Sequence, residues 1–322
     1  MKISIVAPMF NEEENLQLTL SKLKAELKKS NITDYELIFV NDGSTDNTYL
    51  KAKELESKEE VLRVVGYDVN QGRGKAIRTG ILASTGDVIC TIDFDLSYDE
   101  THITRMITTL KENPITDVVL VSCYMPGGKT VGIPPFRLFI SKTANLLYRN
   151  AFTPKVYTST CVVRAYRREA IINLELESDD KEIHLEILSK LLSTGSKILE
   201  IPGTLTKRKE EGKVKRKTFK FRRHSISHII YFIQEKPFAL FGMIGVFLFG
   251  LSFFSMGVLL YTRFGGNEWF NSTGISKLMS PSFIIILFLS GLQMVGLGFL
   301  GIQNNLLKKE LFKTQKMINK KY

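Results

Sequence analysis

Apolar stretches alternate with helical stretches along the first 95 residues and predict a mostly parallel sheet. Four of the apolar stretches are rich in Val, Ile and Phe and end in polar turns, as buried strands do. These strand-like stretches are residues 2–10, 35–43, 61–69 and 86–95. Between the first two, residues 12–30 repeat leucine at helical spacing, and further helices are expected from Thr45 and Gly74. Strands alternating with helices favour an α/β fold with helices on both faces of the sheet.

Two long uncharged stretches near the C-terminus predict transmembrane helices. Residues 238–261 provide 24 positions without a charged side chain and residues 278–307 provide 30. A span of about 20 apolar residues is enough to cross the hydrocarbon core of a bilayer. Lysines and arginines gather before the first stretch and after the second, so the positive-inside rule places both termini in the cytoplasm. Three widely spaced cysteines also suit a reducing compartment.

The excess of positive charge is concentrated just before the first span. The chain carries 44 Lys and Arg against 33 Asp and Glu, and residues 207–223 alone hold ten Lys and Arg against two Glu. Such a run could bind nucleic acid, an anionic membrane or a phosphorylated ligand. Its position beside a span favours an interfacial helix on anionic lipid and argues against a nucleic-acid binder. The expected organisation is a soluble domain over 1–206, a basic interfacial segment over 207–236, a two-helix transmembrane hairpin over 237–307 and a basic cytoplasmic tail over 308–322.

The predicted strands all end in polar residues. In open α/β sheets, ligands bind at the edge where the carboxyl ends of the parallel strands meet. Four polar strand ends on one rim favour a nucleotide cleft over four unrelated turns. These ends are Pro8 to Glu12, Asn41 to Ser44, Asn70 to Lys75 and Asp93 to Asp95.

Asp93 and Asp95 stand two apart at the end of the fourth strand-like stretch. Residues i and i+2 of a strand point the same way, so both carboxylates are expected on one side of the strand's tip. Two carboxylates so close repel each other unless a divalent cation neutralises them, and hard oxygen ligands suit Mg²⁺ or Mn²⁺. A solvated acidic turn is the alternative interpretation of this pair taken alone.

The glycine-rich segment 70–80 differs from the best-known phosphate loops. It lacks the third glycine of a dinucleotide fingerprint and the Gly-Lys-Ser/Thr of a P-loop. A hydride-transfer enzyme and an ATPase are therefore poor fits. The helix start and the Lys75 side chain could still bind phosphate, or the segment could be a plain tight turn.

Taken in order, these motifs resemble the family-two inverting glycosyltransferases, which have a GT-A fold with a Rossmann-like, mostly parallel sheet. The resemblance rests on VAPMFNEEENL, ELIFVNDGSTDNT, NQGRGKAIRTGILASTGD and DFDLS. Three later stretches are similar to one subgroup, the polyprenyl-phosphate glycosyltransferases, which includes dolichyl-phosphate mannose synthases. They are PGGKTVGIPPFRLFISKTANLLYR, RAYRREAI and LEILSKLLSTGSKILEIPGTLTKRKEEGK.

The resemblance implies an enzyme that transfers a hexose, with inversion, from a nucleotide-diphosphate sugar to a polyprenyl phosphate such as dolichyl or undecaprenyl phosphate. Donors of the GDP-mannose or UDP-glucose type are expected. Asp93 and Asp95 would hold Mg²⁺ or Mn²⁺ on the donor diphosphate. The residues expected at the donor nucleotide are Pro8, Phe10, Glu12, Asp42, Lys75 and Asp93.

On the acceptor side, the resemblance assigns Arg137, Ser141 and Arg208 to the lipid phosphate, with Asp95 at the same reacting centre. Because a phosphate acceptor is already anionic, cations that hold two anions together matter more than a strong general base. Arg137 and Ser141 stand four apart, on one face of a predicted helix with an apolar side for the bilayer. The alternatives are a snorkelling surface arginine for Arg137 and a lipid-facing charge for Arg208.

Two positions depart from the subgroup's pattern. Cys123 stands where the subgroup carries an arginine, and Thr158 where it carries an aspartate. These departures leave open the alternative that the protein is a catalytically degenerate partner subunit, which binds nucleotide or lipid phosphate without transferring sugar. A processive polysaccharide synthase is disfavoured because the chain has no Gln-x-x-Arg-Trp element. Analogy with anchored relatives predicts a homo-oligomer, with a tetramer as the expected state.

Overall fold

The computed structural model of the chain describes residues 1–151, 156–207, 237–265 and 280–319. The chain forms two compact units. One is Met1–Phe219 with Phe312–Tyr322, and the other is Lys220–Leu311. Of the predicted basic interfacial segment, only Lys207 is among the described residues. Arg208 therefore lies outside them.

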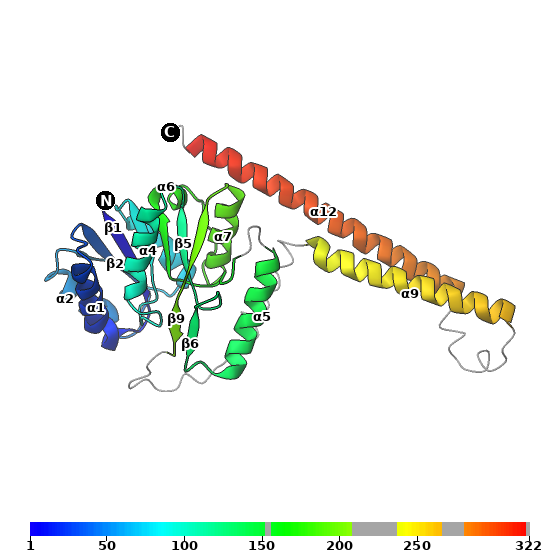
Figure 1. Ribbon diagram of the computed structural model, residues 1–322, viewed down its shortest axis with the longest axis horizontal. Helices are drawn as coiled ribbons and strands as arrows, with labels where there is room; N and C mark the ends of the chain where they lie inside the picture. The colour runs from blue at the N-terminus through cyan, green and yellow to red at the C-terminus, as the bar shows by residue number, and fades with distance from the viewer. Residues whose placement is uncertain (152–155, 208–236, 266–279, 320–322) are drawn as a thin grey trace. The chain divides into compact units, whose positions relative to one another are not determined.

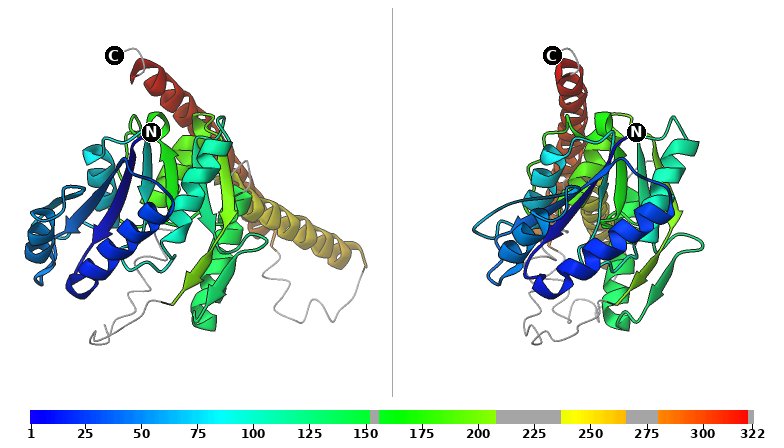
Figure 2. Two further views of the ribbon diagram at one scale, coloured as in Figure 1. Left: turned by 60° about the vertical axis from the view of Figure 1, so that its left-hand side comes forward. Right: turned by 90° about the vertical axis from the view of Figure 1, so that its left-hand side faces the viewer.

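Within the described residues, a seven-stranded sheet runs through the first unit in the order β3-β2-β1-β4-β7-β5-β8 (Figures 1 and 2). Neighbours pair in parallel, except that β7 is antiparallel to both β4 and β5. A separate parallel pair joins β6 and β9. The strands are β1 (Ile3–Met9), β2 (Tyr35–Asp42), β3 (Leu62–Tyr67), β4 (Val88–Thr91), β5 (Val118–Ser122), β6 (Lys129–Val131), β7 (Arg164–Arg167), β8 (Ile198–Pro202) and β9 (Thr204–Thr206). The prediction of a mostly parallel sheet is confirmed.

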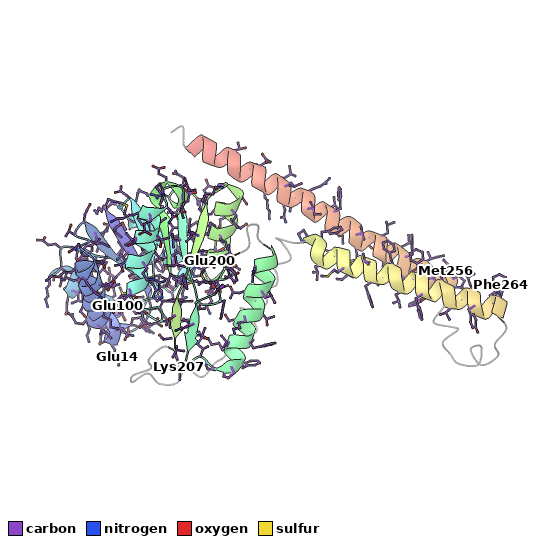
Figure 3. All side chains as sticks on the ribbon, viewed as in Figure 1. Glu14, Glu100, Glu200, Lys207, Met256 and Phe264 are labelled. Atoms are coloured by element: carbon purple, nitrogen blue, oxygen red, sulfur yellow. The ribbon has the colours of Figure 1, made fainter. Side chains whose placement is uncertain are left out.

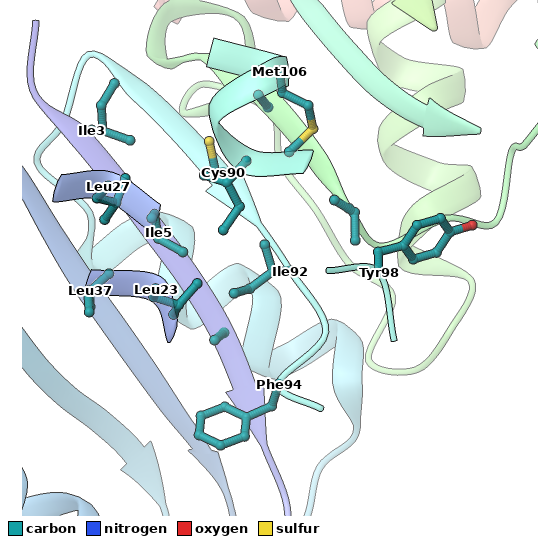
Figure 4. Close-up of a cluster of buried hydrophobic side chains, with 14 of the residues drawn as sticks. Ile3, Ile5, Leu23, Leu27, Leu37, Cys90, Ile92, Phe94, Tyr98 and Met106 are labelled. Carbon is teal, nitrogen blue, oxygen red and sulfur yellow. The ribbon is translucent and has the colours of Figure 1, made fainter. Parts of the chain in front are cut away.

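Helices cover both faces of this sheet. The side chains of β1 alternate between the two faces, because successive residues of a strand point in opposite directions. On one face, Ile5 packs with the leucines of α1 and with α4 in the main core cluster (Figure 4). On the other face, α3 packs closely because of Gly80, where a Cβ would lie 2.2 Å from Val6 Cγ1. The helices of this unit are α1 (Leu16–Lys29), which follows the 3₁₀ helix η1 (Glu13–Asn15), α2 (Thr48–Glu56), α3 (Arg73–Ala83), α4 (Thr101–Glu112), α5 (Pro135–Ala151), α6 (Arg168–Ile171) and α7 (Ile183–Ser193).

Two long helices, α9 (Pro237–Gly265) and α12 (Pro281–Asn319), are long and apolar enough to cross a membrane. Their candidate spans are Leu240–Tyr261 and Pro281–Lys308, and only 17% and 22% of the most apolar windows are buried inside the protein. The predicted apolar stretches therefore form helices whose surfaces are mostly uncovered by protein. Such surfaces suit a lipid environment better than the core of a soluble domain.

Glycines bring α9 and α12 into close contact. A Cβ at Gly245 would lie 2.9 Å from the carbonyl oxygen of Gly291, and one at Gly301 would lie 2.4 Å from Pro237. The Ser252 hydroxyl donates a hydrogen bond of 3.1 Å to a carbonyl oxygen of α12. Small residues and interhelical hydrogen bonds are how helices associate in lipid, where apolar burial gives little driving force.

Candidate active site

The carboxyl ends of β1, β2 and β4 lie side by side because these strands pair in parallel. Asn11, just beyond β1, ties the first two ends together. Its Oδ1 accepts a hydrogen bond of 2.8 Å from the N–H of Thr45, and its own N–H donates to Ser44 Oγ at 3.1 Å. The predicted donor residues at or just beyond these strand ends are Pro8, Phe10, Glu12, Asp42 and Asp93. The sheet therefore brings together the rim that the sequence predicts.

Asp42 is buried and holds the loop that follows β3. Its Oδ1 accepts hydrogen bonds of 3.0 Å from the N–H groups of Gln71 and Gly72, and its Oδ2 accepts one of 2.9 Å from the Asn70 amide. The next residue, Gly43, has φ +62°, and a Cβ there would lie 2.2 Å from the backbone nitrogen of Asn70. In this structure Asp42 therefore shapes the wall of the predicted nucleotide cleft.

Asp93 and Asp95 flank a tight turn just beyond the end of β4. Between them Phe94 is buried in the core (Figure 4). The N–H of Leu96 donates to the Asp93 carbonyl at 3.1 Å, and Leu96 has φ +48°, a conformation that a non-glycine residue seldom adopts. Asp95 Oδ1 accepts hydrogen bonds from the Ser97 N–H at 3.0 Å and from its hydroxyl at 2.7 Å. An unfavourable backbone conformation next to a fixed carboxylate is typical of functional sites.

A positive charge that the sequence analysis missed lies beside this turn. Arg73, at the start of α3, forms an ion pair with Asp93, with 3.3 Å between Nη1 and Oδ1. Partial desolvation lowers the pKa of Lys181, and the positive charges of Arg73 and Arg137 lower it further. The carboxylates of Asp180 and Glu182 oppose these effects. Arg73 therefore supplies the positive charge that contacts the Asp93–Asp95 turn.

The glycine-rich segment packs against a loop from a distant part of the chain. The N–H groups of Gly74 and Lys75 donate to the Asp179 carbonyl at 2.7 and 3.2 Å, and a Cβ at Gly74 would lie 2.3 Å from the Ser178 carbonyl oxygen. Arg78 reinforces the contact by pairing with the Asp179 carboxylate. The helix start therefore holds the loop that leads to Lys181. Lys75 lines a pocket of about 400 Å³ along α3 whose lining includes none of the other predicted donor residues.

The carboxylates of Asp93 and Asp95 are oxygen ligands of the kind that Mg²⁺ and Mn²⁺ prefer. No group of three or more His, Cys, Asp or Glu side chains that could hold a metal occurs among the described residues. A two-carboxylate site leaves coordination positions for phosphate oxygens of a substrate and for water, which suits Mg²⁺ or Mn²⁺ and not structural zinc. These two residues therefore fit the predicted ion.

Cys123, the first departure from the subgroup, points into the core. The Tyr98 hydroxyl lies against the thiols of both Cys123 and Cys161, and burial raises the pKa of each thiol, to about 12 for Cys161. An arginine at position 123 would have to displace this packing. The missing cation must be supplied from elsewhere if the site needs it.

Thr158, the second departure, lies beside another carboxylate. Its hydroxyl shares a hydrogen bond of 2.6 Å with Ser122, and its N–H donates to Glu200 Oε1 at 2.9 Å. Glu200 Oε2 accepts a hydrogen bond of 2.7 Å from the Tyr157 N–H. Glu200, labelled in Figure 3, thus places an acidic group against position 158, although position 158 itself is neutral.

The ionisation of Glu200 gives a pH-dependent prediction. Burial raises the pKa of its carboxyl above the usual value for glutamate, although the hydrogen bonds from the Tyr157 and Thr158 N–H groups favour the charged form. Because the pKa of Glu200 is higher in the folded protein than in the unfolded chain, the protonated carboxyl stabilises the fold at pH values below the unfolded pKa. This stabilisation is lost as the pH rises through the folded pKa. We expect Glu200→Gln to gain stability relative to wild type as pH rises from about 4.5 towards neutrality, measured by urea unfolding at a series of pH values. A pH-independent difference would contradict the assignment.

The acceptor-side residues Arg137 and Ser141 both lie on α5, one turn apart. Arg137 is exposed. Ser141 accepts a hydrogen bond of 2.8 Å from the Tyr124 hydroxyl, which ties α5 to the segment after β5. Arg208, the third predicted acceptor residue, lies outside the described residues.

Comparison with known proteins gives the class. Residues 4–174 match the model of glycosyl transferase family 2, and the chain belongs to this family. It is 34% identical over 229 residues to a dolichol-phosphate mannosyltransferase of Pyrococcus furiosus, a match covering 70% of this chain and 62% of that relative, less than two thirds of its length. It is 28% identical to an undecaprenyl-phosphate 4-deoxy-4-formamido-L-arabinose transferase of Yersinia enterocolitica, over 93% of this chain and 87% of the relative.

A solved structure shows the same fold. A glucosyl-3-phosphoglycerate synthase of Mycobacterium tuberculosis, in complex with Mn²⁺, UDP and glucosyl-3-phosphoglycerate, matches with a TM-score of 0.55 at 19% identity. The match covers 73% of this chain and 79% of the other. The predicted GT-A fold and the family resemblance are confirmed.

Proposed function

We propose that this protein transfers a hexose, with inversion, from a nucleotide-diphosphate sugar to a polyprenyl phosphate on the cytoplasmic face of a membrane. The observation that carries the proposal is the Asp93–Asp95 turn beyond β4, with the Arg73 guanidinium 3.3 Å from the Asp93 carboxylate. A pair of carboxylates that suits a divalent cation, with an arginine beside it, can hold the diphosphate of a sugar donor. The two relatives named for dolichol phosphate and undecaprenyl phosphate support this acceptor class. A donor of the GDP-mannose or UDP-glucose type belongs to the same proposal.

In the proposed reaction the donor occupies the rim of β1, β2 and β4. Pro8, Phe10 and Glu12 border the nucleoside, and Asp42 shapes its pocket. Mg²⁺ or Mn²⁺, held by Asp93 and Asp95, would neutralise charge on the diphosphate as it leaves, and the Mn²⁺ in the structural relative supports a divalent ion. Arg73, paired with Asp93, adds positive charge on the same side.

The acceptor phosphate would be bound by Arg137, Ser141 and Arg208. One of its oxygens attacks the anomeric carbon from the face opposite the diphosphate, and this geometry inverts the configuration. A phosphate monoester is already charged near neutral pH, so no strong general base is needed. The protein contributes orientation and electrostatic stabilisation, the two largest sources of catalysis for such a transfer.

The membrane arrangement is also a proposal. α9 and α12 would form a two-span hairpin, with the sheet-bearing unit and both termini in the cytoplasm, as the flanking lysines and arginines indicate. The domain limits predicted from the sequence and a homotetramer belong to the same proposal.

The test is transfer of radiolabelled sugar into organic-extractable lipid. The full-length protein in detergent would receive Mn²⁺ or Mg²⁺ and either dolichyl or undecaprenyl phosphate. GDP-mannose, UDP-glucose and UDP-N-acetylglucosamine would be offered separately. We expect label in lipid from one of these donors. Absence of transfer from all of them, with metal-dependent nucleotide binding retained, would contradict the proposal and favour a partner subunit.

A further inference from the structure

A pocket of about 420 Å³ lies between α5 and the segment that follows β5. One face of α5 lines it, with Lys142, Asn145, Leu146 and Arg149 at spacings of three, four and seven residues. The rest of the lining includes Cys123, Tyr124 and Met125, which follow β5. None of the roles proposed above uses Lys142 or Arg149.

The walls of this pocket are fixed by polar contacts. Asn145, only 2% exposed, accepts a hydrogen bond of 2.9 Å from the Ser159 N–H and donates one of 2.9 Å to the Ser141 carbonyl. The Arg149 guanidinium stacks over the Tyr157 ring, 4.0 Å from its centroid. These contacts attach α5 to the segment before β7. Fixed walls allow a pocket to select its ligand.

The charged side chains that line the pocket are positive and would favour an anionic ligand. Its described lining includes two cations, Lys142 and Arg149, and no carboxylate. Glu200 lies behind the Tyr157 wall, and its oxygens accept the N–H groups of Tyr157 and Thr158. A phosphate monoester carries a charge of about −1.5 to −2 near pH 7, which two cations balance.

The other residues that line the pocket would suit an apolar group attached to that anion. Tyr124, Met125 and Leu146 contribute apolar surface, and Leu146 is 56% exposed. Phe136 and Phe139 continue an exposed apolar surface along α5, at 65% and 67% exposure. An anion pocket next to such a surface fits a phosphate joined to a hydrocarbon chain better than it fits inorganic phosphate.

We propose that this pocket binds the phosphate head of the lipid acceptor, with Lys142 and Arg149 supplying the positive charge from one face of α5. The inference rests on the proposed function and names two further binding residues for it. Lys142 directly follows Ser141, so the pocket extends the predicted acceptor site along α5. Lys and Arg side chains are long enough to converge on one phosphate from positions two helical turns apart.

The test measures binding of farnesyl phosphate to the full-length protein in detergent. Lys142→Met and Arg149→Met should each weaken binding about tenfold, as expected for loss of one charge-assisted contact to phosphate. Lys129→Met is the matched control, because Lys129 is an exposed lysine on the neighbouring β6 that does not line the pocket. It should leave the affinity within about twofold of wild type. Lys142→Arg, which keeps the charge, should restore most of the binding.

Further arms separate the possible outcomes. Farnesol and inorganic phosphate should each bind much more weakly than farnesyl phosphate, and equal binding of inorganic phosphate would overturn the assignment to a lipid head. Metal-dependent UDP and GDP binding should be unchanged in every variant, which shows that the fold is intact. If the wild type transfers sugar and Lys142→Met and Arg149→Met keep its acceptor KM, the inference is wrong although the proposed function stands. If the variants lose farnesyl phosphate binding but the wild type transfers no sugar, the pocket binds a lipid phosphate that is not a sugar acceptor, and the proposed function is wrong.

Discussion

Replacing Asp95 by asparagine is expected to reduce sugar transfer to lipid about 10³-fold, mainly in kcat. The amide keeps the size of the side chain and can still accept the hydrogen bonds from Ser97. It removes the negative charge that would hold a divalent ion on the diphosphate. Metal-dependent binding of the donor nucleotide should weaken in parallel, because Asp93 remains as a single carboxylate, already paired with Arg73.

Asp34→Asn is the control for this substitution. Asp34 is exposed and stands just before β2, at the opposite end of that strand from the candidate site. Its replacement removes the same charge and should leave transfer within about twofold of wild type. Full activity of Asp95→Asn at all metal concentrations would remove the Asp93–Asp95 turn from the mechanism.

Replacing Arg164 by methionine is expected to destabilise the sheet-bearing unit by about 3 kcal/mol, which lowers the melting temperature by about 8 °C. Arg164 is fully buried in β7 and donates to the carbonyl oxygens of Cys161 at 2.7 Å, His184 at 2.9 Å and Ser159 at 2.7 Å. Methionine fills much of the volume but leaves three buried acceptors without this donor. Relief of the buried charge offsets part of the loss.

Arg105→Met supplies the comparison in the same heating experiment. Arg105 is exposed and donates a single hydrogen bond of 2.8 Å, to the carbonyl oxygen of Pro202. Its loss should shift the melting temperature by less than about 2 °C. Equal shifts for the two variants would show that the buried network of Arg164 contributes nothing beyond an ordinary surface arginine.

The strands up to residue 91 could be predicted because their signals are local. Apolar runs, polar turns and leucines at helical spacing depend only on neighbouring residues, and Leu16, Leu20, Leu23 and Leu27 are all buried as their spacing predicts. β7 could not be found in the same way. Its sequence is Arg-Ala-Tyr-Arg, and the burial of Arg164 requires carbonyl groups from Ser159 and His184. Only the assembled fold supplies those partners.

The candidate site shows the same limit. The spacing of Asp93 and Asp95 indicated two neighbouring carboxylates at a strand end, but the expected strand geometry was wrong, because β4 ends at Thr91 and both residues lie at the turn beyond it. Lys181 lies in an acidic stretch that reads as a solvated loop. The loop that leads to Lys181 is held at the start of α3 by the contact between Gly74 and the Asp179 carbonyl, which joins segments about 100 residues apart. The place of Glu200 beside Thr158 likewise depends on pairing between β5 and β8. Such non-local contacts leave no periodic signal in the chain.

The burial of the three cysteines has a practical consequence for mapping the chain in a membrane. Cys90, Cys123 and Cys161 are buried, and burial raises the pKa of each thiol, to about 12 for Cys90 and Cys161. Thiolate is the reactive form, so these side chains should be nearly inert towards maleimides in the folded protein. Single cysteines introduced on either side of the α9–α12 hairpin would then report their own accessibility to an impermeant label, with the native residues left in place.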